Sequence, residues 1–486
     1  MAPRRRNPYP GLVAVALVPT LLLGGCWRFA DGRAPAGSAS PSTSSVAPGE
    51  PAAPSALTTP VMSVRRAPAV LARDVNVSTF VDDLQPLIDV IDPTSCLTVA
   101  IDGAPVTAVN DEVPLRPASN VKVITAAVAL EVLGPEFVYT TEVTGAMGDG
   151  GVVAGNLFFV GGGDPLLSSS WWTGPNQKFP PFNVTSIEAL ADSVKAAGVT
   201  AVNGSVVGDA SHYDDEWYLP TWGDGVRFSE GGPLSGLLVN DSREAIDRSS
   251  NDPVVGAATV LTQLLRERGI TVGGAPRAGT ADDSPVIASI DSLPLPAVLE
   301  QMLTTSDNNT AELMLKEIGL QAGGAPTSVG GLAVVMETLG EWGIPLDGVT
   351  LVDGSGLSDE NRLTCASLLE VLQHGSVDDA VGQGLPVGGE EGGTLNDAFQ
   401  EGQPLSGVIR AKTGTLHNTD GVADKPGTKA LGGYIPQVGG GAIEFVMFLN
   451  GETITNQSEY RPIWELFAGI MAGYPSGPAA DTLGPR

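Results

Sequence analysis

Three segments of the chain share one pattern of apolar and polar positions. In each, apolar residues recur at intervals of three and four, and a glycine and then a β-branched residue follow. This spacing predicts a helix that buries one face, and the glycine supplies the left-handed position that commonly ends a helix. We therefore predict three helices, each closed by glycine and followed by a strand: Ile187–Ala197 before Gly198, Ala257–Arg268 before Gly269, and Leu332–Trp342 before Gly343.

Other segments are short apolar runs rich in β-branched and aromatic residues, which predict buried strands. The clearest four are Leu97–Ile101, Val408–Ala411, Leu431–Ile435 and Ile443–Leu449. The last three follow one another through connections that contain glycine, an order typical of an antiparallel meander. The sequence thus predicts an antiparallel sheet that includes the C-terminal part of the chain.

The segment Val121–Leu133 is apolar on nearly every face and is followed by Gly134 and Pro135. A helix of this composition is buried on all sides instead of lying at a surface. A buried helix beside an antiparallel sheet is an α+β arrangement. One basic residue, Lys122, interrupts the apolar run in its first turn. A lysine is unexpected in a buried helix, so its position requires an explanation.

The first residues have the order of an export signal. Three arginines, Arg4–Arg6, precede the apolar run Leu12–Leu23, and two glycines and Cys26 follow. The run is shorter than the roughly 20 residues that span a bilayer, so cleavage is favoured over membrane spanning. The end of the run also resembles a bacterial lipobox, in which Cys26 is lipidated, and ordinary cleavage and lipidation both stay open. We expect an exported protein that meets a membrane only through an N-terminal anchor or lipid.

Two further segments have the composition of flexible chain. Residues 27–73 are rich in serine, proline, alanine and threonine and are predicted to form a disordered tether. Residues 475–486 are predicted to form a flexible tail.

The composition excludes several classes of function. Asp and Glu number 55 against 26 Lys and Arg, and the resulting net charge of −29 repels nucleic acid. With three His and three Cys in 486 residues, the chain has no cluster at metal-ligand spacing, and no cofactor is predicted. If Cys26 is lipidated or removed, Cys96 and Cys365 remain; they either form a disulfide or lie apart as small buried residues.

Three short motifs carry the candidate chemistry. Ser119 and Lys122 lie three residues apart at the start of the buried helix, so the hydroxyl and the amine share a face and can exchange a proton. Ser306-Asp307-Asn308 lies between two predicted helices, where these residue types are equally typical of a helix N-cap. Lys412-Thr413-Gly414-Thr415 lies at the end of a predicted strand, and Gly414 permits close approach of a ligand. Each motif alone is weak evidence.

Together and in this order, Ser-x-x-Lys, Ser-x-Asn and Lys-Thr-Gly form the motif set of the penicillin-recognising serine enzymes. The interval between Ser119 and Ser306 is far longer than in a class A β-lactamase, which predicts a large insertion between the first two motifs. The chain resembles the class C low-molecular-mass penicillin-binding proteins, the D-alanyl-D-alanine carboxypeptidases/endopeptidases of peptidase family S13, over about Asp74–Gly473. Further segments carry the resemblance: Gly162-Gly163-Asp164-Pro165, Val207-Gly208-Asp209, Val239-Asn240-Asp241 and Asp353-Gly354-Ser355-Gly356-Leu357-Ser358.

The resemblance implies a fold and a domain order. We expect a transpeptidase/β-lactamase-like α+β domain, with an antiparallel sheet flanked by helices, formed by residues 74–137 and 270–474. Residues 138–269 would form an inserted domain.

The resemblance also implies roles for the motif residues. Ser119 would attack a D-Ala carbonyl, and Lys122, which burial and the nearby cation Lys412 hold neutral, would take its proton. Ser306 would relay that proton to the leaving amine, and Asn308 would orient Lys122 and the substrate backbone.

The third motif would recognise the substrate. The backbone N–H groups of Ser119 and Thr415 would form the oxyanion hole, and Lys412, Thr413 and Thr415 would bind the terminal carboxylate. The expected enzyme acts outside the cytoplasm, in the bacterial cell envelope, on peptidoglycan stem peptides through an acyl-enzyme, and β-lactams acylate it.

Two other functions stay open. A β-lactamase or esterase on the same scaffold would differ by rapid deacylation of a β-lactam, and a non-catalytic wall-binding module is disfavoured by the intact motifs. An α/β-hydrolase is not supported, because the chain has no Gly-x-Ser-x-Gly. His417, two residues after Thr415, is more typical of a structural than of a catalytic histidine.

Overall fold

The computed structural model describes residues 67–172, 178–223, 226, 230–417, 426–438 and 440–479. The predicted signal segment, Cys26 and residues 27–66 of the predicted tether lie outside these ranges. The end of the tether prediction was wrong, because residues 67–73 begin helix α1 (Ala67–Asp83). Only widely spaced side chains of this helix, such as Ala72 and Phe80, are buried, which explains why the apolar pattern did not reveal its first turn.

A five-stranded antiparallel sheet, in the order β15-β16-β17-β1-β2, forms the base of the fold. The predicted C-terminal meander is confirmed, and the first strand of the chain pairs with the last, with Val99 opposite Phe445. The strands are β1 Cys96–Ile101, β2 Ala104–Val109, β15 Arg410–Leu416, β16 Gly427–Pro436 and β17 Ala442–Gly451.

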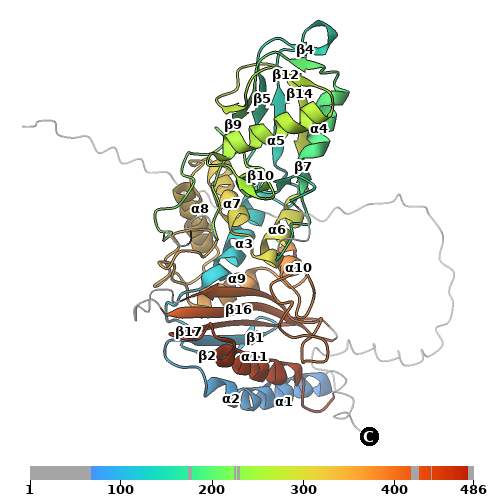
Figure 1. The fold of residues 1–486 in the computed structure, drawn as a ribbon. Coiled ribbons are helices and arrows are strands. Elements are labelled where there is room, and N and C mark those ends of the chain that lie inside the picture. The colour runs from blue at the N-terminus through green and yellow to red at the C-terminus, as the bar shows by residue number, and fades with distance from the viewer. Residues whose placement is uncertain are drawn as a thin grey trace, which may run out of the picture. The chain divides into compact units, whose positions relative to one another are not determined.

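This sheet separates two hydrophobic cores, because successive side chains of a strand point to opposite faces. Phe445 and Met447 enter the core beneath α1, α2 and α11, whereas Val446 and Phe448 enter the core that holds the remaining helices. Figure 1 shows the two sets of helices on opposite faces of the sheet, and the predicted α+β class is confirmed. The helices are α2 Gln85–Ile88, α6 Leu295–Thr305, α7 Asn308–Gln321, α8 Ser328–Glu341, α9 Cys365–His374, α10 Ala380–Gly384 and α11 Gln457–Ala472.

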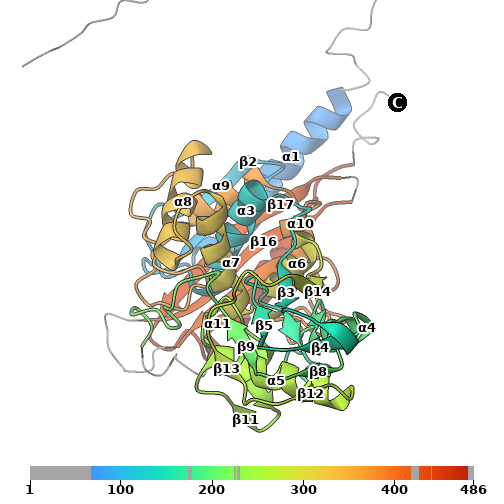
Figure 2. The same cartoon turned by 90° about the horizontal axis from the view of Figure 1, so that it is seen from above.

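Helix α3 (Val121–Leu133) has the predicted bounds and lies inside the second core. Viewed from above, it lies among α6, α7, α8 and α9 (Figure 2). Neighbours on every side explain why the helix is apolar on every face. The short helical turn before it, Ala118–Asn120, contacts β15 and β16, so the start of α3 lies at the edge of the sheet.

A second, mixed sheet in the order β13-β9-β5-β3-β14 follows α3, and a small parallel sheet, β12-β8-β4, shares its core with α4 and α5. These elements form the green part of Figure 1. The helices are α4 Ile187–Ala196 and α5 Pro253–Glu267, and the strands are β3 Thr140–Thr144, β4 Val152–Val153, β5 Leu157–Val160, β6 Leu167–Ser168, β7 Thr185–Ser186, β8 Ala201–Val202, β9 Val206–Asp209, β10 Arg243–Ala245, β11 Arg248–Ser249, β12 Thr271–Val272, β13 Arg277–Ala278 and β14 Val286–Asp291.

The predicted end of the insert at residue 269 is too early. Strands β12, β13 and β14 follow that residue and pair with β8, β9 and β3 of the insert. The chain therefore leaves the insert between Asp291 and the start of α6. Most side chains of β13 and β14 are exposed or half-buried, so the sequence contains no apolar run that would predict these strands.

The helix–glycine–strand pattern holds at two of its three positions. Gly198, Gly269 and Gly343 all have positive φ, as expected at helix ends. Short strands follow the first two, β8 and β12, but none follows Gly343. That prediction was wrong because Ile344, the β-branched residue after Gly343, contributes instead to the core around α3.

Cys96 and Cys365 form a disulfide that joins the first residue of β1 to the first residue of α9. Their Cα atoms lie 6.2 Å apart. The bond crosses from the sheet to the layer of helices above it, so it ties together two parts of the fold that are 269 residues apart in the chain.

Candidate active site

Ser119 and Lys122 lie together at the start of α3. The Lys122 Nζ atom is 3.2 Å from the Ser119 Oγ atom, as their spacing predicts. Ser119 is half-buried, whereas Lys122 has no exposed surface. The hydroxyl is thus accessible to a substrate while the amine is not.

The Lys122 amine has two further partners that can only accept hydrogen bonds. Its Nζ atom lies 2.6 Å from Asn308 Oδ1 and 2.6 Å from the Ser355 carbonyl oxygen. A neutral amine has two N–H groups and one lone pair, so with both N–H groups engaged the lone pair faces Ser119. Burial lowers the pKa of Lys122 to about 8, although the carboxylates of Asp353 and Glu312 act in the opposite direction. The amine is thus suited to accept the Ser119 proton near neutral pH.

The second motif begins in the short connection between α6 and α7 and ends at Asn308, the first residue of α7. Asp307 is the N-cap of α7, and its carboxylate accepts a hydrogen bond from the Thr310 N–H at 2.9 Å. The capping interpretation is therefore correct for Asp307. Ser306 adopts φ = 62°, and its hydroxyl accepts a hydrogen bond from Lys412 Nζ at 2.8 Å, while Asn308 holds Lys122.

The sequence predicted Lys412 at the end of a strand. It lies inside β15 instead, because the Lys-Thr-Gly-Thr residues continue to pair with β16. The side chain is completely buried. Burial and the positive charges of Lys122 and Lys429 hold the pKa of Lys412 well below its usual range. Each of the two buried lysines thus contacts one residue of the Ser-x-Asn motif.

The remaining residues of the third motif lie along the same edge strand. A Cβ atom on Gly414 would lie 2.8 Å from the Pro117 carbonyl oxygen, so only glycine lets β15 approach the Ser119 turn this closely. Thr413 Oγ1 hydrogen-bonds to Thr394 Oγ1 at 2.9 Å. Thr415 is exposed. The structure thus brings the three motifs to one place.

The sequence profile of the D-Ala-D-Ala carboxypeptidase 3 (S13) family matches residues 93–241 and 233–468. The chain belongs to this family. It is 30% identical to a D-alanyl-D-alanine carboxypeptidase of an Actinomadura species, with 73% of this chain and 78% of the relative covered. Carboxypeptidase DacB of Mycolicibacterium smegmatis is also 30% identical, over 75% of this chain and 78% of that protein.

Solved structures show the same fold. Penicillin-binding protein 4 of Haemophilus influenzae superposes with a TM-score of 0.63 at 20% identity, over 80% of this chain and 98% of that one. A second structure of that protein, in complex with a β-lactam, superposes with a TM-score of 0.58 at 21% identity, over 82% of this chain and 99% of that one.

In this S13-family chain, sequence reasoning missed the loop that supports Lys122. The Ser355 carbonyl contacts the Lys122 amine, and the buried carboxylate of Glu312 accepts hydrogen bonds from the Gly354 and Ser355 N–H groups. A Cβ atom on Gly356 would lie 1.9 Å from the Ala118 carbonyl oxygen, so this loop packs directly on the Ser119 turn. The Asp-Gly-Ser-Gly segment was part of the resemblance, but its contact with Lys122 follows only from the fold.

The insert also reaches the motifs. The Asn308 Nδ2 atom donates a hydrogen bond to the Glu230 carbonyl oxygen at 2.8 Å. The next residue, Asn309, accepts a hydrogen bond from the Gly232 N–H at 2.7 Å and donates one to Asp241 Oδ1 at 2.9 Å. The insert therefore holds the start of α7 from the side opposite the sheet.

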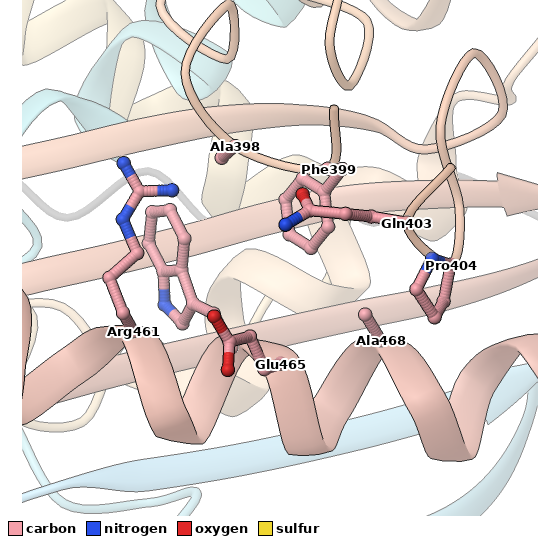
Figure 3. Close-up of a pocket in the computed structure, with 8 residues that line it drawn as sticks. Ala398, Phe399, Gln403, Pro404, Arg461, Glu465 and Ala468 are labelled. Carbon is pink, nitrogen blue, oxygen red and sulfur yellow. The ribbon is translucent and has the colours of Figure 1, made fainter. Parts of the chain in front are cut away.

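A cavity of about 390 Å³ lies on the face of the sheet opposite α3, between α11 and residues 398–404. Figure 3 shows Phe399, Arg461 and Glu465 around it. None of the motif residues lines this cavity.

Among the described residues, no cluster of His, Cys, Asp or Glu could hold a metal ion, and no helix is long and apolar enough to cross a bilayer.

Proposed function

We propose that this chain is an exported serine-type D-alanyl-D-alanine carboxypeptidase that removes the terminal D-Ala from peptidoglycan stem peptides through an acyl-enzyme on Ser119. The environment of Lys122 carries the proposal, because a buried amine with two acceptors already engaged directs its lone pair at the serine hydroxyl. The names of the relatives, which are carboxypeptidases, support the substrate class.

In acylation, the Ser119 proton passes to Lys122 as Oγ attacks the carbonyl carbon of the penultimate D-Ala residue. The backbone N–H groups of Ser119 and Thr415 stabilise the oxyanion, and the start of α3 adds a favourable field. The C–N bond then breaks as Ser306 gives its hydroxyl proton to the departing amine and takes up in exchange the proton that Lys122 holds. Water hydrolyses the ester in the second step and restores Ser119.

Recognition of the terminal carboxylate is assigned to Lys412, Thr413 and Thr415. A local cation is needed because the protein carries a net charge of −29 and the substrate terminus is anionic. Carboxylate binding would favour the charged form of Lys412, whose pKa is otherwise lowered by burial.

Labelling with a fluorescent penicillin, followed by mass mapping, tests the nucleophile. We expect the label on Ser119, no label on the Ser119→Ala variant, and acylation slowed by about two to four orders of magnitude in Lys122→Ala because the base is absent. Full labelling of the Ser119→Ala variant would contradict the assignment.

Product analysis separates the related activities. A carboxypeptidase releases free D-Ala from a stem peptide, and an endopeptidase also opens cross-linked peptide dimers. A β-lactamase or esterase would instead turn the penicillin adduct over rapidly. A long-lived adduct together with D-Ala release is the result that we expect.

Fractionation tests the form of export. If Cys26 carries a lipid, Cys26→Ala moves the protein from the membrane fraction to the medium or the soluble envelope fraction. An unchanged distribution would favour an ordinary cleaved signal or an uncleaved anchor.

A further inference from the structure

Lys429, a residue outside the three motifs, contacts the exposed threonine at the end of the third motif. It lies on β16 directly opposite Thr415, and its Nζ atom is 2.9 Å from Thr415 Oγ1. The ammonium group also lies 4.5 Å from the ring centre of Tyr460 and 5.5 Å from that of Trp464, both on α11. These rings hold the ammonium group beside the strand through cation–π attraction.

This contact fixes the direction of the Thr415 hydroxyl proton. A charged ammonium group can only donate, so Thr415 Oγ1 must accept from Lys429. The single proton of the hydroxyl is then free to be donated elsewhere. Because β15 is the edge strand and Thr415 is exposed, that proton is available to a carboxylate bound beside the strand.

The charge of Lys429 also acts in the direction that the substrate needs. Among the described residues, no carboxylate lies within ion-pair distance of its Nζ atom. Asp397 is the carboxylate that raises the pKa of Lys429, and it forms an ion pair of 2.8 Å with Arg461. The other charges that interact with it are positive: Arg461, and Lys178 of the insert, lower the pKa of Lys429, and Lys429 lowers that of Lys412. Lys429 thus adds a cation where the protein as a whole is acidic.

We propose that Lys429 is a positioning residue that makes the enzyme specific for substrates with a free C-terminal carboxylate, by presenting the Thr415 O–H to that carboxylate. This inference rests on the proposed function, because it assumes that the carboxylate lies beside β15. It adds to the three motifs a residue that only the cross-strand register brings to the site.

The proposal has a consequence for pH dependence. Burial lowers the pKa of Lys429 to about 8; Asp397 opposes this shift, and Arg461 and Lys178 add to it. Above that pH the amine is neutral and can accept the Thr415 proton, which turns the hydroxyl away from the substrate. KM for a free-acid substrate should therefore rise above about pH 8, while an arginine at this position, which stays charged, should keep KM low.

The test compares two pairs of ligands that differ only in the carboxylate: a peptide ending in D-Ala-D-Ala and its C-terminal amide, and benzylpenicillin and its methyl ester. Wild type, Lys429→Met, Lys429→Arg, Thr415→Val and the double variant Lys429→Met/Thr415→Val are measured by kcat/KM for the peptides and by acylation rate for the penicillins. Lys195→Met, on an exposed face of α4, is the control for the loss of one positive charge.

We expect Lys429→Met to lose about tenfold on each free acid and to change little on the amide and the ester, since a charge-assisted hydrogen bond is worth about that factor. Lys429→Arg should retain the preference and extend it to higher pH, and Lys195→Met should behave as wild type. In the Thr415→Val background, Lys429→Met should lose much less than in wild type, because only the long-range effect of its charge remains.

Equal losses on the acid and on its neutral counterpart, or independent effects of Lys429 and Thr415 in the double variant, would overturn the role of Lys429. These results are distinct from a failure of the proposed function, in which wild type cleaves neither peptide. In that case the penicillin pair still measures the preference for the carboxylate.

Discussion

At the scale of single residues, the site depends on two buried lysines with different tasks. In the proposed mechanism Lys122, which contacts Ser119, has to be neutral, whereas Lys412, which is buried behind Ser306, has to be charged when the substrate carboxylate binds. Burial makes the first task easy and the second costly, and the positive charges of Lys122 and Lys429 lower the pKa of Lys412 further. The anionic substrate itself therefore completes the charge balance of the site.

The pKa of Lys122 predicts how acylation depends on pH. Its pKa is lowered to about 8, so below that value the fraction of neutral amine, and with it the acylation rate, falls about tenfold per pH unit. The rate should rise with pH and level off above about 8. The methyl ester of a penicillin is the suitable probe, because its acylation does not depend on carboxylate binding. A rate independent of pH between 6 and 8 would show that Lys122 is not the base.

At the scale of elements, the start of α3 is fixed by the loop that holds Gly356. That glycine has φ = 83°, and a Cβ atom there would lie 1.9 Å from the Ala118 carbonyl oxygen. Gly356→Ala should therefore displace Ser119 or the loop. Because misplacement by about 1 Å can cost a hundredfold, we expect penicillin acylation to fall by about that factor and Tm to fall as well.

A second glycine provides the matched control. Gly340 lies inside α8, where an added Cβ atom would approach only Leu346 Cδ1, at 4.0 Å. Gly340→Ala should keep the wild-type rate and raise Tm slightly, because alanine favours a helix over glycine by about 1 kcal/mol. Similar behaviour of the two variants would mean that the contact between the loop and Ala118 does not position the nucleophile.

Helices and strands were predictable where the local pattern of apolar and polar residues matches the faces that they bury. The helix Val121–Leu133 and the C-terminal meander were predicted because their buried residues are apolar and follow one another in the sequence. Strands β13 and β14 were missed because their mostly exposed side chains carry no alternation. The motif residues were visible for a different reason, because their types and order together resemble the motif set of the penicillin-recognising serine enzymes.

The supporting residues were not predictable in this way. Lys429 meets Thr415 through strand register, and Ser355 meets Lys122 through a contact between segments 233 residues apart in the chain. No local spacing encodes either contact. Their residue types are ordinary in a strand or a loop, and only the assembled fold makes them part of the site.

At the scale of the whole molecule, the insert contacts the candidate active site. The sequence predicted an insert between the first two motifs, but neither its end nor its contacts with the second motif. Asn308 is held between Lys122 on one side and the Glu230 carbonyl of the insert on the other. The indole N–H of Trp222, also in the insert, donates to the Asp353 carboxylate, which caps the loop that contacts Lys122. The insert is thus expected to affect rate as well as stability.

Exchange of one amide and one carboxylate tests this coupling. Asn309 joins the Gly232 N–H to the Asp241 carboxylate, so Asn309→Asp sets two carboxylates at a hydrogen-bond distance of 2.9 Å. Burial already raises the pKa of Asp241 to about 7, so the measurement is made well above that pH, where both carboxylates are charged. There the like charges should push the insert segment away from α7, slow penicillin acylation about tenfold and lower Tm. The double variant Asn309→Asp/Asp241→Asn restores one donor and one acceptor to the same pair of positions and should recover both quantities. Loss of Tm with an unchanged acylation rate would show that the insert only packs against α7. A double variant as slow as Asn309→Asp would show that the bond between Asn309 and Asp241 is not how the insert positions Asn308.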